Sequence, residues 1–91
     1  MAPTAEPEAV FHPEFRQDLR HWVEPDRKTA FRILALVEAV LSNPFTGIGK
    51  PEPLRENLAG FWSRRIDDTN RMVYTVDKTD LIVIACRYHY D

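Results

Sequence analysis

The apolar residues of this chain follow a helical period in the first half and a two-residue period in the second. A first helix is predicted to begin at Pro13, and its apolar face would consist of Phe15, Leu19, Trp22 and Val23. Proline suits the first helical position, because the N–H that it lacks would have no helical partner there. A short strand is expected just before this helix, over residues 9–11.

A second helix is expected from about residue 27 to residue 41, after a break at residues 24–26. Asp26 can cap it, and Asn43-Pro44 ends the pattern. Because the break between the two helices is short, the sequence predicts an antiparallel helical hairpin. The predicted buried face of the second helix comprises Ala30, Ile33, Leu34, Val37, Val40 and Leu41.

The second half of the chain begins with a loop and then reads as a small sheet. Residues 44–53 hold three prolines and two glycines, which predict a loop. Beyond it, strands are expected over residues 61–66, 72–76 and 81–88, separated by turn-forming residues at 67–70 and 77–80. Three consecutive strands with short turns form an antiparallel meander, and the third is apolar enough to be an interior strand.

The register of the first two meander strands is open at this point. A loop of residues 66–70 would place Arg65 opposite Arg71 on one face of the sheet. A loop of residues 67–70 would pair Ile66 with Arg71 and turn Arg65 to the other face. Two neighbouring arginines would repel each other, so the first register favours an anion between them.

Composition indicates one ordinary globular domain of 91 residues, in which residues 1–6 form a loose tail. No apolar run is long enough to span a membrane, and no secretory signal is visible. The chain has a single cysteine, Cys86, inside an apolar run, which predicts a small buried residue and excludes a disulfide within the chain. These features together favour the cytoplasm.

Charge and chemistry narrow the possible functions. The formal net charge of −2 argues against a general nucleic-acid binder, so any activity on RNA needs a local arginine cluster or a partner that presents the RNA. One carboxylate, several arginines and a terminal His-Tyr pair can cleave RNA without a metal. The three histidines are scattered along the chain, so neither a metal nor another cofactor is expected.

Four separated segments resemble one known family. They are GKPEPL at residues 49–54, NLAGFWSRRI at 57–66, RMVY at 71–74 and ACRYHY at 85–90. In this order and at this spacing they closely resemble the YoeB toxins of the RelE superfamily. The resemblance implies an α+β fold similar to microbial ribonucleases, in which an N-terminal helical hairpin packs on a curved antiparallel sheet. It also implies a ribosome-dependent mRNA endonuclease that a YefM-type antitoxin holds inactive.

The same resemblance implies roles for individual residues. Glu52 resembles the general base and His89 the general acid. Arg65 and Arg71 resemble the pair that stabilises the transition state, and Tyr90 resembles a residue that positions the acid or the substrate. The remaining cationic residues near these motifs are expected to bind RNA phosphates: Lys50, Arg55 and Arg64.

Two positions depart from the family pattern. Arg55 stands where relatives commonly have lysine; arginine keeps the positive charge but cannot exchange a proton near neutral pH. Asp91 follows the His-Tyr pair at which relatives typically end. If this carboxylate folded back over Arg65 and Arg71, it would occupy the place of the scissile phosphate; if it stays exposed, screening makes its effect small.

The sequence therefore predicts a toxin of a type II toxin–antitoxin system that cleaves mRNA on the ribosome without a metal. A homodimer and a complex with a YefM-type antitoxin are expected. Two other functions stay open. One is a non-enzymatic inhibitor on the same fold, such as the gyrase-directed relatives, and the other is a regulatory binding module whose arginines hold an acidic partner.

Overall fold

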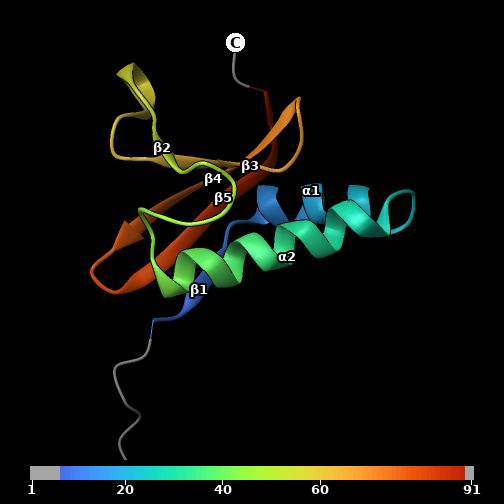
Figure 1. Cartoon of the computed structure of the whole chain (residues 1–91), viewed down its shortest axis with the longest axis horizontal. Helices are drawn as coiled ribbons and strands as arrows, with labels where there is room; N and C mark the ends of the chain where they lie inside the picture. Colours follow the sequence, from blue (N-terminus) through green and yellow to red (C-terminus); the bar gives the residue numbers. More distant parts are fainter. Residues whose placement is uncertain (1–6, 90–91) are drawn as a thin grey trace, which may run out of the picture.

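The computed structural model describes residues 7–88 and the backbone of His89. The expectations for residues 1–6, Tyr90 and Asp91 lie outside the described residues. Two helices cover one side of a five-stranded sheet (Figure 1). In chain order the elements are β1 (Ala9–Phe11), α1 (Pro13–Val23), α2 (Arg27–Ser42), β2 (Glu52–Pro53), the 3₁₀ turn η1 (Glu56–Leu58), β3 (Trp62–Arg65), β4 (Asn70–Asp77) and β5 (Asp80–His89).

The sheet has the order β1-β5-β4-β3-β2. The expected antiparallel meander is present as β3, β4 and β5, and β5 is an interior strand. The predicted α+β class is confirmed, but the sheet is mixed, because β1 pairs with β5 in parallel. The sequence did not show this pairing because a three-residue strand does not reveal its partner.

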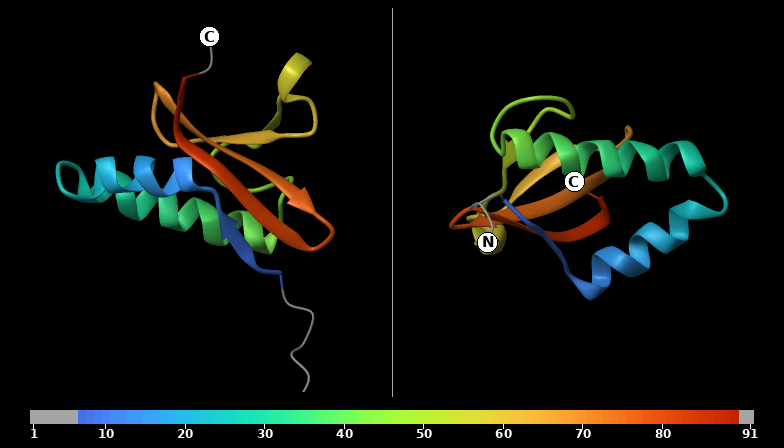
Figure 2. Two further views of the ribbon diagram at one scale, coloured as in Figure 1. Left: turned by 180° about the vertical axis from the view of Figure 1, so that it is seen from behind. Right: turned by 90° about the horizontal axis from the view of Figure 1, so that it is seen from below.

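The two helices begin where the sequence places their caps. His12 precedes α1, and its Nδ1 accepts a hydrogen bond from the backbone N–H of Glu14. Asp26 caps α2 by accepting bonds from both the backbone N–H and the hydroxyl of Thr29. The helices diverge from the turn that joins them, so both contact the sheet (Figure 2). None of the helices in the described part of the chain has the length and apolarity to cross a membrane.

The core lies between the helices and the inner face of the sheet. Most of the predicted face of α2 is buried, but Leu34 is 45% exposed while Leu36 is fully buried. The prediction for Leu34 was wrong, because α2 packs along a line nearer to Ile33 and Val40. Cys86 is buried in this core, as expected.

Strand β5 pairs irregularly with β4 over its second half. Arg71 and Val73 lie two residues apart on β4, yet their partners Tyr88 and Ala85 lie three apart on β5. A second extra residue of β5 follows between the partners of Val73 and Tyr74. Such bulges bend a strand and change which face its side chains occupy.

Candidate active site

The outer face of the sheet, away from the helices, brings together the predicted catalytic residues of three strands. Arg65 lies opposite Arg71, so the first of the two possible registers is the one that forms. Glu52 lies opposite Ser63 on the neighbouring strand pair. Residues directly opposite in paired strands share a face, so Glu52 and the two arginines belong to one surface.

The turn between β3 and β4 sets this register. The carboxylate of Asp67 accepts hydrogen bonds from the backbone N–H groups of Thr69 and Asn70, at 2.8 and 2.6 Å. The backbone N–H of Ile66 donates to the carbonyl of Asn70. An aspartate that binds its own turn in this way fixes the loop length, and the loop length decides that Arg65 faces Arg71.

Arg71 is the centre of the site. Its Nη1 donates to Oε2 of Glu52 at 3.1 Å and to Oγ of Ser63 at 3.2 Å. The Arg71 side chain is 13% exposed and the Glu52 side chain 47% exposed. A guanidinium carries five N–H donors in a planar fork, a geometry that suits the binding of an anion such as a phosphate. The carboxylate also offsets part of the repulsion between the two arginines.

Arg65 is exposed, and its backbone is held on both sides. Its N–H donates to the carbonyl of Gly49 at 2.6 Å, and its own carbonyl accepts a bond from Nη2 of Arg32 at 3.2 Å. These bonds tie the end of β3 to the loop before Glu52 and to α2. The Arg65 side chain therefore projects into solvent from a fixed backbone.

Glu52 lies in a two-residue edge strand that the sequence analysis placed within a loop. Its neighbours Pro51 and Pro53 lack N–H donors, and proline is tolerated in sheets mainly at edges. The strand ends where the N–H of Leu54 donates to the carbonyl of Phe61. The prolines restrict the backbone on both sides of the carboxylate, and this restriction holds Glu52 beside Arg71.

Arg64 does not take the predicted phosphate-binding position. It lies opposite Met72 on the inner face and is fully buried. Its guanidinium donates to the carbonyls of Asn43, Thr46 and Ile48, and its Nε donates to the Tyr74 hydroxyl. The neighbouring arginines fall on opposite faces because side chains alternate along a strand, so Arg64 holds the loop while Arg65 faces solvent.

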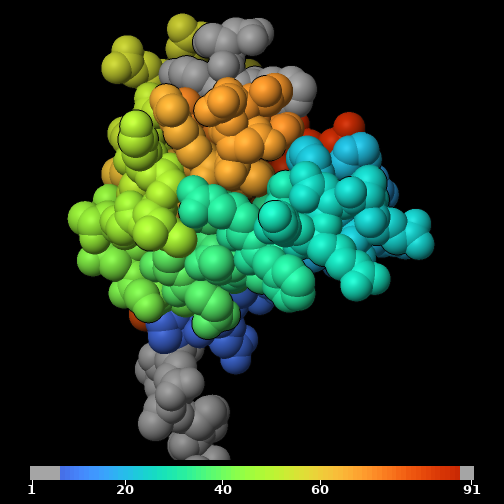
Figure 3. Space-filling view, turned by 45° about the vertical axis from the view of Figure 1, so that its right-hand side comes forward, coloured from blue at the N-terminus to red at the C-terminus, as the bar shows by residue number. Residues whose placement is uncertain are grey.

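Tyr74 completes this buried network. Its hydroxyl donates to the carbonyl of Pro44 at 2.7 Å, and burial raises the pKa of the phenol. The loop that leads to Glu52 is thus bound to the inner sheet face at Asn43, Pro44, Thr46 and Ile48. Figure 3 shows this loop, in yellow-green, packed against the green end of α2.

The other predicted residues lie close to the site along the chain. Lys50 and Arg55 are exposed on either side of Glu52. His89 lies at the end of β5, where its backbone pairs with Asn70, next to Tyr88 opposite Arg71. Tyr90 lies outside the described residues.

Two residues of this surface were missed by the sequence analysis. Ser63 is fully buried and hydrogen-bonds Arg71. Its position two residues before Arg65, and hence on the same face, was the available signal. Tyr88 lies directly opposite Arg71, but the bulges of β5 conceal from the sequence which residues of that strand share the face of Arg71.

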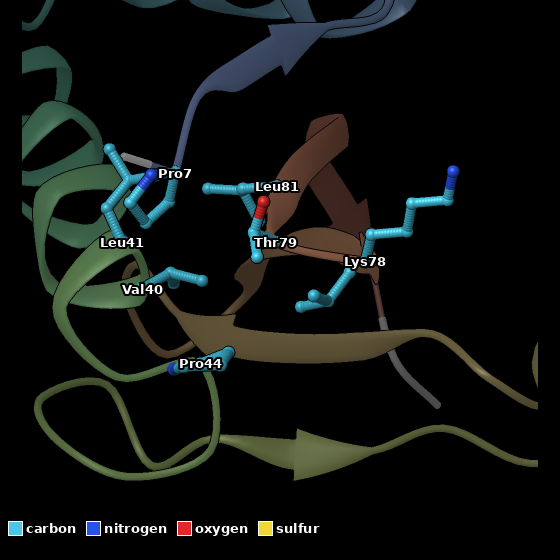
Figure 4. Close-up of a pocket in the computed structure, with 8 residues that line it drawn as sticks. Pro7, Val40, Leu41, Pro44, Lys78, Thr79 and Leu81 are labelled. Carbon is cyan, nitrogen blue, oxygen red and sulfur yellow. The ribbon is translucent and has the colours of Figure 1, made fainter. Parts of the chain in front are cut away.

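One cavity lies at the other end of the sheet. A cavity of about 210 Å³ at the far end of β4 is lined by Val40, Leu41 and Leu81, among others (Figure 4). Its walls are mainly apolar, and Lys78 and Thr79 of the β4–β5 turn border it, at the opposite end of the sheet from Arg71. Within residues 7–88, no group of three or more His, Cys, Asp or Glu side chains could hold a metal ion.

A helical hairpin on a five-stranded sheet, with a carboxylate and two arginines on the open face, defines a small α+β protein with a candidate acid–base and anion-binding site. The family model for YoeB-like toxins of bacterial type II toxin–antitoxin systems matches residues 11–90. Toxin YoeB of Streptomyces coelicolor is 50% identical over 74 residues, which are 81% of this chain and 88% of that protein. The chain therefore belongs to the family of YoeB-like toxins.

Solved structures agree with this assignment. The YoeB/ParE toxin from Agrobacterium tumefaciens superposes with a TM-score of 0.87 at 39% identity, over 91% of this chain and 99% of that one. The YoeB dimer from Staphylococcus aureus gives a TM-score of 0.86 at 38% identity, over 94% and 100% of the two chains. A heterotetrameric YoeB–YefM complex from the same organism gives 0.83 at 38% identity, with the same coverage.

Proposed function

We propose that this chain is a ribosome-dependent endoribonuclease that cleaves mRNA without a metal and thereby inhibits translation. The observation that carries the proposal is the hydrogen bond between Arg71 and Glu52, beside Arg65 on the open face of the sheet. A carboxylate can accept a proton there while two guanidinium groups stabilise the charge that develops on a phosphate.

In this mechanism Glu52 takes the proton of a ribose 2′-hydroxyl, and the 2′-oxygen attacks the adjacent phosphorus. Arg65 and Arg71 bind the phosphate oxygens as their negative charge increases. The bond from phosphorus to the 5′-oxygen breaks, and His89 donates a proton to that oxygen. The products are a 2′,3′-cyclic phosphate, or the 3′-phosphate formed from it by hydrolysis, and a 5′-hydroxyl.

The surrounding residues have supporting roles in the proposal. Tyr90 positions the acid or the substrate, and Lys50 and Arg55 contact neighbouring phosphates from exposed positions on either side of Glu52. Arg71 has two roles in the proposal: it holds the carboxylate in place before RNA binds, and its guanidinium binds the phosphate during cleavage. Ser63 holds Arg71 in the orientation that allows both contacts.

The partners follow from the family. Because a YoeB dimer and a YoeB–YefM complex exist in Staphylococcus aureus, we expect a homodimer and a complex with a YefM-type antitoxin in the cytoplasm. An antitoxin segment that folds over the arginine face would block the approach of RNA. Light scattering at high micromolar concentration measures the dimer, and a strict monomer under these conditions would contradict it.

Primer extension on an mRNA that is being translated tests the activity. The wild-type chain should produce new 5′ ends within codons, and Glu52→Gln should nearly abolish them. Arg65→Ala and Arg71→Ala should each remove about 2–4 kcal/mol of transition-state stabilisation, as do other preorganised donors. Wild-type cleavage by a folded Arg65→Ala, Arg71→Ala double variant would reject this assignment.

The same assay separates the non-enzymatic functions. An inhibitor of gyrase would stop growth without new mRNA ends, and a regulatory binding module would be harmless in cells that lack its partner. Neither function requires the contact of Arg71 with Glu52. Growth arrest that survives Glu52→Gln at full strength would therefore favour a non-enzymatic inhibitor.

A further inference from the structure

Helix α1 binds a single residue of β5, Cys86, at three of its atoms. The backbone N–H of Cys86 donates to Oδ2 of Asp18 at 3.0 Å, and its carbonyl accepts a bond from Nε1 of Trp22 at 3.1 Å. The thiol lies 3.8 Å from the carbonyl of Phe15. Asp18 and Trp22 are four residues apart, so they lie on the same face of the helix.

We call these three contacts of α1 the Cys86 anchor. Its position in the sheet explains why β5 needs hydrogen bonds from α1 here. β1 covers the outer edge of β5 only at Leu81, Ile82 and Val83. Among residues 7–89, no strand pairs with this edge beyond Val83, and Cys86 is fully buried there. A buried backbone group without a partner costs free energy comparable to a lost hydrogen bond, and the two side chains of α1 supply the missing partners.

The Cys86 anchor also lies in the part of β5 that pairs irregularly with β4. The four residues from Ala85 to Tyr88 face only the three from Arg71 to Val73, so one residue of β5 between these pairs has no partner on β4. The ladder of hydrogen bonds with β4 is therefore locally disrupted. The contacts of α1 with Cys86 lie between Ala85 and Tyr88 and help to hold this segment of β5 in place.

We propose that Asp18 and Trp22 are positioning residues for catalysis, which hold the end of β5 in the register that places Tyr88 opposite Arg71. The inference rests on the proposed function, in which Arg71 stabilises the transition state. Tyr88 lies two residues beyond Cys86, about 7 Å of extended chain. A slip of one residue in pairing would turn it to the opposite face of the sheet.

Three variants test this role in single-turnover cleavage on translating ribosomes. Asp18→Ala removes the acceptor for Cys86, and Trp22→Phe removes the donor while keeping an aromatic ring in the core. Asp18→Asn keeps an oxygen that can accept the same bond. Displacing a reacting group by about 1 Å can cost up to about a hundredfold in rate. We therefore expect Asp18→Ala and Trp22→Phe to lower the maximal rate about ten- to a hundredfold, whereas Asp18→Asn stays close to wild type.

Two measurements distinguish positioning from a general loss of stability. The toxin concentration that gives half the maximal rate should not change, because the proposal concerns the geometry around Arg71 and not the binding of ribosomes. Asp26→Ala serves as the matched control, since it removes the side chain that caps α2 by bonds to Thr29. It should lower the unfolding temperature and leave the maximal rate unchanged.

The outcomes separate this inference from the proposed function. Loss of cleavage in Arg71→Ala together with a wild-type maximal rate in both Asp18→Ala and Trp22→Phe would overturn the inference alone. Equal losses of rate in Asp18→Asn and Asp18→Ala would also overturn it, because the asparagine keeps the hydrogen bond. Wild-type cleavage by a folded Arg71→Ala variant would overturn both the catalytic role of Arg71 and the inference that depends on it.

Discussion

At the scale of single residues, Arg64 and Arg65 show how two adjacent positions on one strand give the same type of side chain different roles. Arg65 projects into solvent beside Arg71, while Arg64 is fully buried and donates to three loop carbonyls and a tyrosine. The cost of burying its charge is offset by hydrogen bonds to oxygen dipoles, which charged donors make strongly.

Arg64→Lys tests this interpretation. Lysine keeps the charge but lacks the planar fork, so it cannot bind Asn43, Thr46 and Ile48 together. Hydrogen bonds to charged groups contribute about 1.5–3 kcal/mol each, and we expect the free energy of unfolding to fall by roughly 3 kcal/mol. Urea denaturation measures this change. Arg65→Lys is the matched control at an exposed position, and a similar loss there would contradict the assigned role of Arg64.

At the scale of elements, the loop before β2 depends on glycine at one position of close contact. Gly49 has φ +84°, and a Cβ there would lie 2.8 Å from Cδ2 of Leu36 and 3.1 Å from Cβ of Arg64. Gly60 has a similar φ of +94°, yet a Cβ would meet nothing within 4 Å. Both glycines therefore avoid backbone strain, but only Gly49 also avoids a clash.

The pair allows a controlled prediction. Gly60→Ala should cost about 1 kcal/mol of stability, from the left-handed backbone alone. Gly49→Ala should cost at least about 1–3 kcal/mol more, because overpacking adds to the same strain. It should also slow cleavage, since the carbonyl of Gly49 binds the N–H of Arg65. Equal unfolding midpoints for the two variants would show that Gly49 is not closely packed.

The contact between α1 and β5 predicts a dependence of stability on pH. Burial, with a smaller effect of Asp18, raises the pKa of the Cys86 thiol from 9.0 to about 12. A raised pKa of an acid favours the neutral form in the folded state. Its contribution is therefore complete below pH 9 and is lost as the pH rises from 9 toward 12.

The free energy of unfolding should thus fall in alkaline solution, with Cys86 contributing up to about 1.4 kcal/mol per pH unit. Burial raises the pKa of Tyr74 as well, which adds a loss in the same direction. Cys86→Ala should have a shallower decline than wild type in urea titrations between pH 8 and 11. Parallel curves for the two proteins would contradict a buried neutral thiol.

The elements that the sequence predicted correctly share strong local signals. Pro13, Asp26 and the turn residues after Ile66 act on their immediate neighbours, so the sequence predicted the caps, the helices and the meander. The features that were missed depend on distant segments. Examples are the parallel pairing of β1, the burial of Leu36 in place of Leu34, and the bulges of β5.

The residues of the candidate site show the same difference between local signals and contacts with distant segments. The motifs indicated Glu52, Arg65 and Arg71, and the structure brings these three residues together. The role of Arg64 could not be predicted from the sequence, because a pair of arginines does not reveal which one faces the core. Ser63 was overlooked for a similar reason, since its hydroxyl matters only once Arg71 lies beside it.

At the scale of the whole molecule, charge distribution argues that RNA must be presented to this chain. It has 12 Lys and Arg residues against 14 Asp and Glu residues, for a net charge of −2. Nonspecific affinity for nucleic acid comes mainly from the number of phosphates that cationic residues neutralise. In the proposed function the few arginines around Glu52 bind one scissile phosphate, and the net charge of the chain predicts that it attracts free RNA weakly.

Cleavage should therefore be much faster on translating ribosomes than on the same mRNA alone. A ribosome that holds the mRNA in place supplies the orientation that the toxin lacks, and such positioning can contribute several orders of magnitude in rate. We expect at least about a hundredfold difference in single-turnover rates at equal mRNA concentration. The residual cleavage of free RNA should decline steeply as salt rises from about 50 to 200 mM, because each phosphate contact releases counterions. Equal rates on free and ribosome-bound mRNA would show that the arginine face recognises RNA without help, and the ribosome would then not be required.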